Sequence, residues 1–258
     1  MSTMTLYVDR NSILHNTHPL TKLLYVMVSI AITYIIPEVT FVFTVAMITL
    51  ILLILGKVFR KIVPILGLSI ILIISIIIVQ GFFHPENQTE LFSLGFLTFY
   101  QEGLSYAALL TLRVMNMVMS FGILILTTRH DELVEALIKK GLSPKIGYVL
   151  LSVLQLIPQM RATMGKITDA QRSRGMETEG NLLVRMKAFF PLIGPVVLNS
   201  LNVTRERAIA LEVRGFNANR QRSFLNVSKE YRYQKLVQIL LWTALIAAIV
   251  WRIVTWGS

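Results

Sequence analysis

The sequence predicts an all-α, polytopic membrane protein with about five transmembrane helices and further long helices at the cytoplasmic surface. Its 258 residues are 54% hydrophobic and 15% charged, and the mean hydropathy is +0.64. Soluble domains carry about 25% charged residues. Apolar runs of the length that crosses a bilayer recur along the chain. The basic residues, by contrast, gather in one stretch, so embedded and solvated parts can be told apart.

Five segments are apolar enough to be spans. The first two are short, and the third is the clearest because its central part carries no charge. Turn residues, a basic loop at 57–61 and a polar stretch at 84–103 separate the first four. The expected spans are 20–36, 39–55, 62–83, 104–127 and 236–256.

The distribution of charge orients these spans. The loop at 57–61 is basic, whereas the stretch 84–103 contains three Glu and no Lys or Arg. Residues 129–235 hold 18 of the 25 Lys and Arg but 9 of the 14 Asp and Glu. Because basic segments remain in the cytoplasm, we expect a cytoplasmic N-terminus. The same charge next to spans favours an anionic lipid surface over nucleic acid as the partner.

Three regions follow from this pattern. Residues 1–128 form a four-span membrane region, and 236–258 form a C-terminal transmembrane helix. Between them, 129–235 form a cytoplasmic or interfacial region. There we expect a helix ending at Lys139-Lys140-Gly141, a long one over 143–174 kinked at Pro158, and another over 182–214 that is interrupted near Pro191 and Pro195.

A seven-residue phrase in this region occurs twice, 40 residues apart. Both copies read Ala-x-x-x-Arg-Gly-apolar, starting at Ala170 and Ala210. Gly readily adopts the left-handed conformation after a last helical turn, so each copy predicts a helix end. The repeat also suggests two helix tips that present a guanidinium to a partner, since its planar fork binds carboxylates and carbonyls. Both interpretations stand. The candidate residues are Ser173, Arg174, Gly175, Val213, Arg214 and Gly215.

No pattern of residues indicates an enzyme. The chain has no Cys, which excludes thiolate nucleophiles and Cys-ligated metals. Residues 165–168, Gly-Lys-Ile-Thr, lack the upstream Gly of a phosphate-binding loop. The His and acidic residues at 130–135 fit the first turn of a helix better than a metal site. We therefore expect no catalytic residues, no bound cofactor and no metal.

Two polar residues fall inside the fourth span, Arg113 and Asn116. They lie one helical turn apart and should face other helices rather than lipid. A packing role is favoured, and a substrate-binding role stays open.

The paired phrases resemble the Ala-Arg-Gly signatures of the transmembrane T component of energy-coupling factor (ECF) transporters, which include a cobalt-transport permease. Similar stretches are 19–23, 127–128, 157–158 and 206–216, so the resemblance covers nearly the whole chain. There are two departures. Ser173 and Val213 replace the family's Ala before the Arg, and the segment around Pro19 lacks the family's usual Asp and Arg.

The resemblance implies a non-catalytic scaffold in a bacterial or archaeal cell membrane. Two cytoplasmic ABC-type ATPase subunits would bind the ATP, and the Arg-bearing coupling helices would dock on them. A small membrane subunit would bind the substrate, a vitamin or a transition-metal ion. We expect residues 143–160, with Val149 and Val153, to contact that subunit. The alternatives are an ABC permease that lines the substrate path itself, and an integral membrane enzyme.

Overall fold

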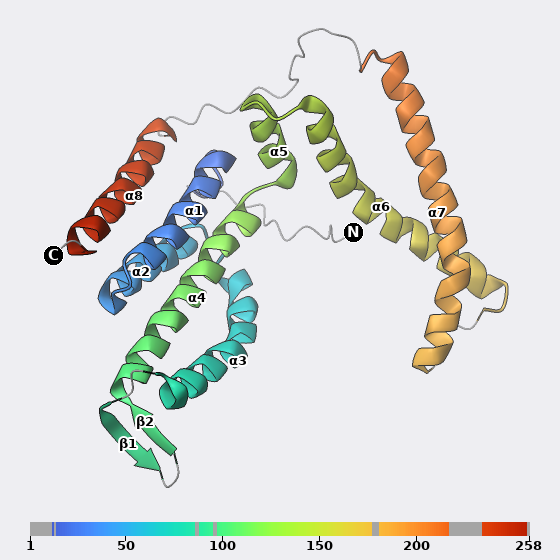
Figure 1. Cartoon of the computed structure of the whole chain (residues 1–258). Coiled ribbons are helices and arrows are strands. Elements are labelled where there is room, and N and C mark those ends of the chain that lie inside the picture. The colour runs from blue at the N-terminus through green and yellow to red at the C-terminus, as the bar shows by residue number, and fades with distance from the viewer. Residues whose placement is uncertain are drawn as a thin grey trace. The chain divides into compact units, whose positions relative to one another are not determined.

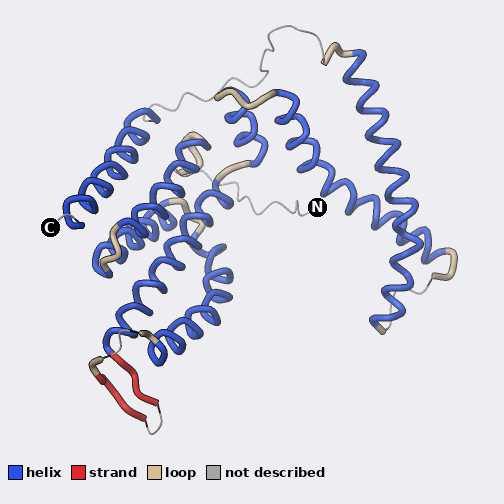
Figure 2. The backbone as a smooth tube through the Cα atoms, viewed as in Figure 1, coloured by secondary structure: helices blue, strands red, loops and turns tan. Residues whose placement is uncertain are grey.

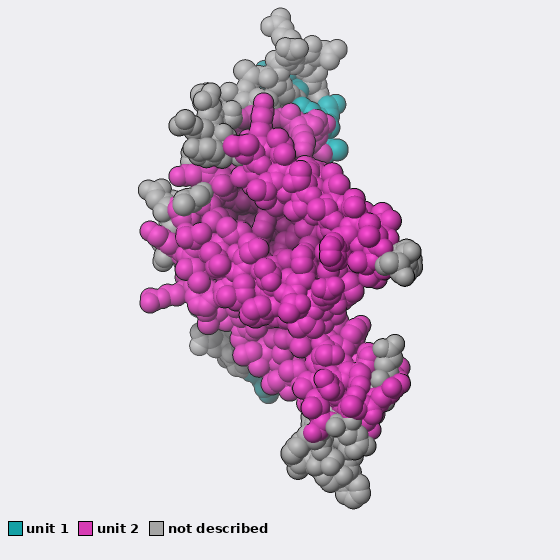
Figure 3. Space-filling view, turned by 90° about the vertical axis from the view of Figure 1, so that its left-hand side faces the viewer, with its two compact units in different colours: residues 1–4, 143–229 teal, residues 5–142, 230–258 magenta. Residues whose placement is uncertain are grey.

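Helices account for most of the chain in the computed structural model (Figures 1 and 2), which describes residue 12 and residues 14–85, 88–94, 97–176, 181–216 and 234–256. This confirms the all-α class. Two compact units divide the chain, and Figure 3 colours them separately. We call residues 5–142 and 230–258 the membrane unit, and residues 1–4 and 143–229 the α6–α7 unit.

The membrane unit contains every expected span. Three helices are long and apolar enough to cross a bilayer: α3 (Phe59–Phe83), α4 (Gln101–Thr127) and α8 (Gln234–Trp256). The other two, α1 (Pro19–Ile35) and α2 (Val39–Leu55), are apolar but have 17 residues each. At 1.5 Å per residue each is about 25 Å long, slightly less than a hydrocarbon core of about 30 Å. The chain is therefore a membrane protein.

A small hairpin joins α3 to α4 and was not expected from the sequence. Strands β1 (Glu90–Leu94) and β2 (Leu97–Tyr100) pair antiparallel, with Leu94 opposite Leu97. The polar character of 84–103 had suggested a loop. Its Phe, Thr and Tyr residues favour strands when a second strand can pair with them. The carboxylate of Glu102 in α4 accepts hydrogen bonds from the backbone amides of Gln88 and Thr89.

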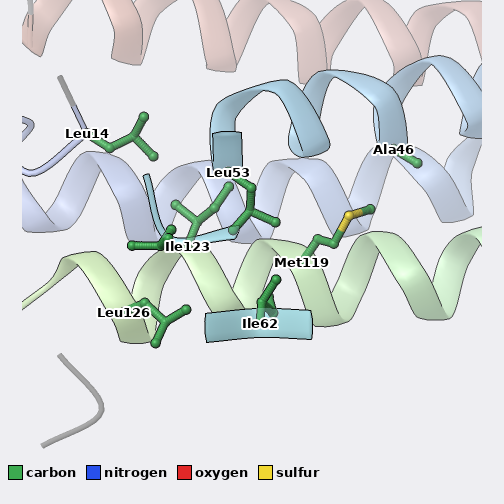
Figure 4. Packing of buried hydrophobic residues seen from close by; sticks show 8 residues of the cluster. Leu14, Ala46, Leu53, Ile62, Met119, Ile123 and Leu126 are labelled. Atoms are coloured by element: carbon green, nitrogen blue, oxygen red, sulfur yellow. The ribbon is translucent and has the colours of Figure 1, made fainter. Parts of the chain in front are cut away.

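The core of the membrane unit lies where α2, α3 and α4 meet. Side chains from these helices and from the segment before α1 form one buried cluster (Figure 4), which consists of Leu14, Ala46, Leu53, Val58, Ile62, Met119, Ile123 and Leu126. A second cluster joins α1 to α8 through Val28, Ile32, Ile36, Leu241 and Ala248. A short helix, α5 (His130–Lys139), follows α4 and packs against α1.

The α6–α7 unit consists of two long helices, α6 (Pro144–Ser173) and α7 (Leu182–Val213). The expected interruption of the second helix was wrong, because α7 continues through Pro191 and Pro195. Each Pro removes one backbone donor, and helices can continue past that loss where flanking turns retain their bonds. Pro158 likewise lies inside α6. Helix α5 lies in the membrane unit, and Ser143 opens the long stretch of the α6–α7 unit.

Candidate functional site

The first Arg-Gly phrase ends α6 in a fixed hydrogen-bonded cap. Gly175 has a φ of +86°, the left-handed conformation that glycine adopts without strain. Its amide donates to the Arg172 carbonyl at 2.9 Å, and the Met176 amide donates to the Gln171 carbonyl at 3.1 Å. These two bonds define a Schellman motif. The predicted helix end is confirmed at this residue.

The second phrase ends α7 in the same way. Gly215 has a φ of +70° and its amide donates to the Glu212 carbonyl at 2.9 Å. The Phe216 amide donates to the Leu211 carbonyl, also at 2.9 Å. The two phrases thus share backbone conformation as well as sequence. The sequence repeat, with its spacing of 40 residues, is therefore also a repeat of the helix cap.

The side chains of the two phrases are also equally accessible. In each copy the first and last residues of the cap are half-buried and the four between them are exposed. The exposed set is Arg172, Ser173, Arg174 and Gly175 in α6, and Glu212, Val213, Arg214 and Gly215 in α7. Val213 is 84% exposed. In the described part of the chain, no hydrogen bond or salt bridge involves the guanidinium of Arg174 or Arg214.

Two contacts fix how α6 and α7 pack against each other. The ring of Tyr148, near the start of α6, lies 5.2 Å from the ring of Phe216, just after α7. The Arg207 guanidinium donates to the Gln159 side-chain oxygen at 2.8 Å. Residue numbers rise along α6 as they fall along α7, so the helices are antiparallel.

This arrangement separates the two Arg-Gly tips. The tip of α7 lies beside Tyr148, and the tip of α6 lies 26 residues further along α6. At 1.5 Å per residue this is about 40 Å along the helix. Figure 1 shows the C-terminal ends of α6 and α7 at opposite ends of the pair. The two tips are therefore too far apart to belong to one binding site.

The predicted contact residues Val149 and Val153 lie on an exposed apolar stripe of α6. They are 57% and 49% exposed. The stripe repeats every three or four residues, which places its members on one side of the helix. Its members are Ile146, Val149, Leu150, Val153, Leu154, Ile157 and Met160.

The polar residues of the fourth span face other helices, as expected. Asn116 is fully buried, accepts a hydrogen bond from the Thr49 hydroxyl of α2 at 2.8 Å and donates to the Ser29 hydroxyl of α1 at 3.0 Å. The hydroxyls of Tyr25 and Ser120 extend this cluster. Because these groups bind one another, their arrangement supports packing rather than a substrate path.

Basic side chains surround the start of α1. The Nδ1 atom of His18 caps this helix by accepting from the Leu20 amide at 3.2 Å. Burial, and then the positive charges of Lys139, Lys140 and Lys22, lower the pKa of His18 below its usual 6.5. The neutral form that this favours is the one that can accept the capping bond.

Sequence analysis did not find the contacts that hold α6 to α7. Gln159 and Arg207 are 48 residues apart, and Tyr148 and Phe216 are separated by still more. Their proximity depends on the antiparallel packing. The aromatic residue after the second Gly was a usable signal, because a hydrophobic residue at this position commonly makes a packing contact.

Comparison with known proteins agrees with this architecture. Residues 10–224 match the CbiQ family, described as a cobalt transport protein. The energy-coupling factor transporter transmembrane protein EcfT of Streptococcus equi is 30% identical over 231 residues, 84% of each chain. The proteins of the same name from Clostridium kluyveri and Lactococcus lactis are 30% and 28% identical, covering 81% and 95% of this chain and 81% and 96% of their own. The chain therefore belongs to the CbiQ cobalt transport protein family and is the transmembrane component of an energy-coupling factor transporter.

Proposed function

We propose that this chain is the coupling scaffold of its transporter. It transmits ATP-driven motion from two cytoplasmic ABC-type ATPase subunits to a small membrane subunit that binds the substrate. Its partners bind the ATP, and the chain itself is not catalytic. The transported substrate is a vitamin or a transition-metal ion, and the cobalt transport described for the matching family supports the second class.

The pair of Arg-Gly tips carries this proposal. Both have the same cap and the same pattern of exposed positions, including the Arg, and they are about 40 Å apart along α6. Two equal and separated tips suit two similar partner subunits. A guanidinium at the C-terminal end of a helix is favoured by the helix dipole, and its planar fork can enter a polar groove on a partner.

The charge distribution supports a cytoplasmic location for these tips. The basic loop at 57–61 and the basic region at 129–235 belong on one side, and the acidic segment 84–103 on the other. Two expected spans separate the N-terminus from the basic loop at 57–61, so the N-terminus is cytoplasmic as well. The ATPase subunits would then meet α6 and α7 on the side where ATP is available.

Substitution of the two arginines tests the proposal. Arg174→Ala and Arg214→Ala should each weaken copurification of the ATPase subunits, and the double variant should abolish uptake and ATP-driven function. Removing one member of a buried charge-assisted pair typically costs about 2–5 kcal/mol. Arg174→Lys and Arg214→Lys should restore function only in part, because an ammonium lacks the planar fork.

Arg205→Ala provides the matched control. Arg205 is also exposed and lies on α7, but nine residues before the tip. Like Arg214→Ala, this substitution removes one positive charge from α7, but it should leave assembly unchanged. Copurification and transport by the double variant at the level of the parent would mean that the phrases are helix ends without a coupling role.

The apolar stripe of α6 is the proposed contact with the substrate-binding subunit. In a membrane, association requires close packing rather than hydrophobicity alone. Val149→Glu and Val153→Glu should release that subunit while the ATPase subunits stay bound. Retention of the subunit by both variants would place its contact elsewhere. Gln155→Glu, at an exposed position two residues after Val153, controls for added charge.

A further inference from the structure

A buried lysine of α1 closes the end of α4. Lys22 is 5% exposed, and its ammonium donates to the backbone carbonyl of Thr127 at 2.8 Å. Thr127 is the last residue of α4, and the last four carbonyls of a helix have no partner within it. The ammonium therefore lies against the negative end of the α4 dipole.

An arginine of α4 closes the end of α1 in return. The Arg113 guanidinium donates through Nε to the carbonyl of Thr33 at 3.0 Å. Thr33 lies in the last turn of α1, where the carbonyls again lack partners within the helix. The same guanidinium lies 4.7 Å from the centre of the Tyr34 ring. Each helix thus supplies the cation that caps the other.

The polar cluster joins the two helices between these caps. Ser29 of α1 exchanges hydrogen bonds with Asn116, and its hydroxyl lies 3.3 Å from that of Ser120. The helices are antiparallel, because residue numbers fall along α4 as they rise along α1. They are consequently fixed to each other at both ends and in the middle, and they lie side by side in Figure 1.

The position of Lys22 links this pair to the cytoplasmic part of the chain. Residues 128–129 separate Thr127 from α5, which packs against α1. Glu132 of α5 attracts the Lys22 ammonium. Placing cations inside a membrane bundle is costly, so cations found there commonly serve function. Here both cations oppose sliding of α1 against α4.

We propose that α1 and α4 move as one rigid lever during transport, and that Lys22 and Arg113 are the positioning residues that prevent relative sliding. The inference rests on the proposed coupling function and identifies the part of the membrane unit that carries the motion. Other parts of the complex would then move relative to this pair of helices, while α1 and α4 keep their positions relative to each other.

An engineered disulfide tests the lever directly, because the chain has no Cys. Ser29→Cys with Ser120→Cys replaces two hydroxyls whose oxygens are 3.3 Å apart. In the assembled transporter, the oxidised double variant should take up substrate at the rate of the same variant after reduction. Loss of uptake on oxidation would show that α1 and α4 must slide, and failure to cross-link would contradict their packing. Either result would overturn the proposal.

Removal of the caps gives a second measurement. Lys22→Met and Arg113→Met should lower the substrate transported per ATP hydrolysed by several-fold in complexes that still contain all subunits. Lys22→Arg should keep the ratio of the parent. In the Lys22→Met background, the disulfide should restore it. Arg252→Met, at an exposed cation of α8, should have no effect. An unchanged ratio in both cap variants would refute their positioning role.

Failure of the lever can be distinguished from failure of the proposed coupling function. If the chain does not couple ATPase subunits at all, the parent itself will not copurify with them, and the Arg174 and Arg214 variants will resemble it. If coupling is correct and the lever is wrong, the parent will assemble and transport normally, and only the disulfide or cap variants will depart from expectation.

Discussion

Gly122 of α4 should tolerate an added methyl group poorly. It is buried where α3 packs on α4. A Cβ atom there would overlap Cδ1 of Ile62 and approach its Cγ1 at 3.1 Å. Ile62 is fully buried in the main core cluster, so it has little room to move (Figure 4).

The expected magnitude follows from two opposing terms. Overpacking a core typically costs about 1–3 kcal/mol. Replacing Gly by Ala inside a helix stabilises it by about 1 kcal/mol. We therefore expect Gly122→Ala to lower the free energy of unfolding by up to about 2 kcal/mol. Gly67→Ala in α3, where a Cβ meets nothing within 4 Å, should stabilise the protein instead.

A double-mutant cycle isolates the contact. Ile62→Val removes the overlapping Cδ1 and alone should cost about 0.5–1.5 kcal/mol. Combined with Gly122→Ala it should cost less than the sum of the two, with a coupling of about 1–2 kcal/mol. Unfolding in mixed micelles containing SDS gives the free energy of unfolding of the purified parent, the two single variants and the double variant. Additive effects, or a stabilising Gly122→Ala, would refute this packing of α3 on α4.

Three further predictions use other parts of the membrane unit. Burial and then the neighbouring lysines lower the pKa of His18, so the unfolded chain takes up the proton more readily, and stability should be complete above pH 6.5 and fall as the pH drops below it. His18→Asn, which can still cap α1, should remove that dependence in thermal unfolding. Asn116→Leu should cost about 2 kcal/mol or more in the same SDS assay, since hydrogen bonds between membrane helices contribute about 0.6 kcal/mol on average and its partners lose theirs. Gln88→Cys, next to β1, should react with an impermeant thiol reagent from outside intact cells, and labelling only after lysis would reverse the proposed orientation.

Helix ends and apolar spans could be predicted because their causes are local. Gly175 and Gly215 end helices through their own backbone freedom, and this requires no knowledge of the rest of the fold. That Asn116 faces other helices could likewise be predicted, because a lone amide among apolar residues avoids lipid. Its partners could not, since Ser29 lies 87 residues away and any polar group of another span would satisfy the same rule.

The features that were missed depend on contacts between elements. The hairpin of β1 and β2 exists because two short apolar segments pair, although their surroundings are polar. Helix α7 continues through Pro191 and Pro195 because the hydrogen bonds of the flanking turns outweigh the loss of two backbone donors. The caps by Lys22 and Arg113 combine a cation and a helix end more than 75 residues apart in sequence. Only the antiparallel register of α1 and α4 places them together.

A third helix end has the same cap without an arginine, so the proposed coupling role depends on the arginines rather than on the caps. At the end of α5 the amides of Gly141 and Leu142 donate to the carbonyls of Ile138 and Leu137, and Gly141 has a φ of +116°. This is the same Schellman motif, with the exposed side chain of Lys140 where the phrases have Arg. Cap geometry alone thus recurs at a helix end that lacks the phrase. Arg174→Lys and Arg214→Lys test this distinction, because they preserve the cap and the positive charge and replace the guanidinium by an ammonium. A loss of coupling in these variants would assign the role to the guanidinium rather than to the cap or the charge.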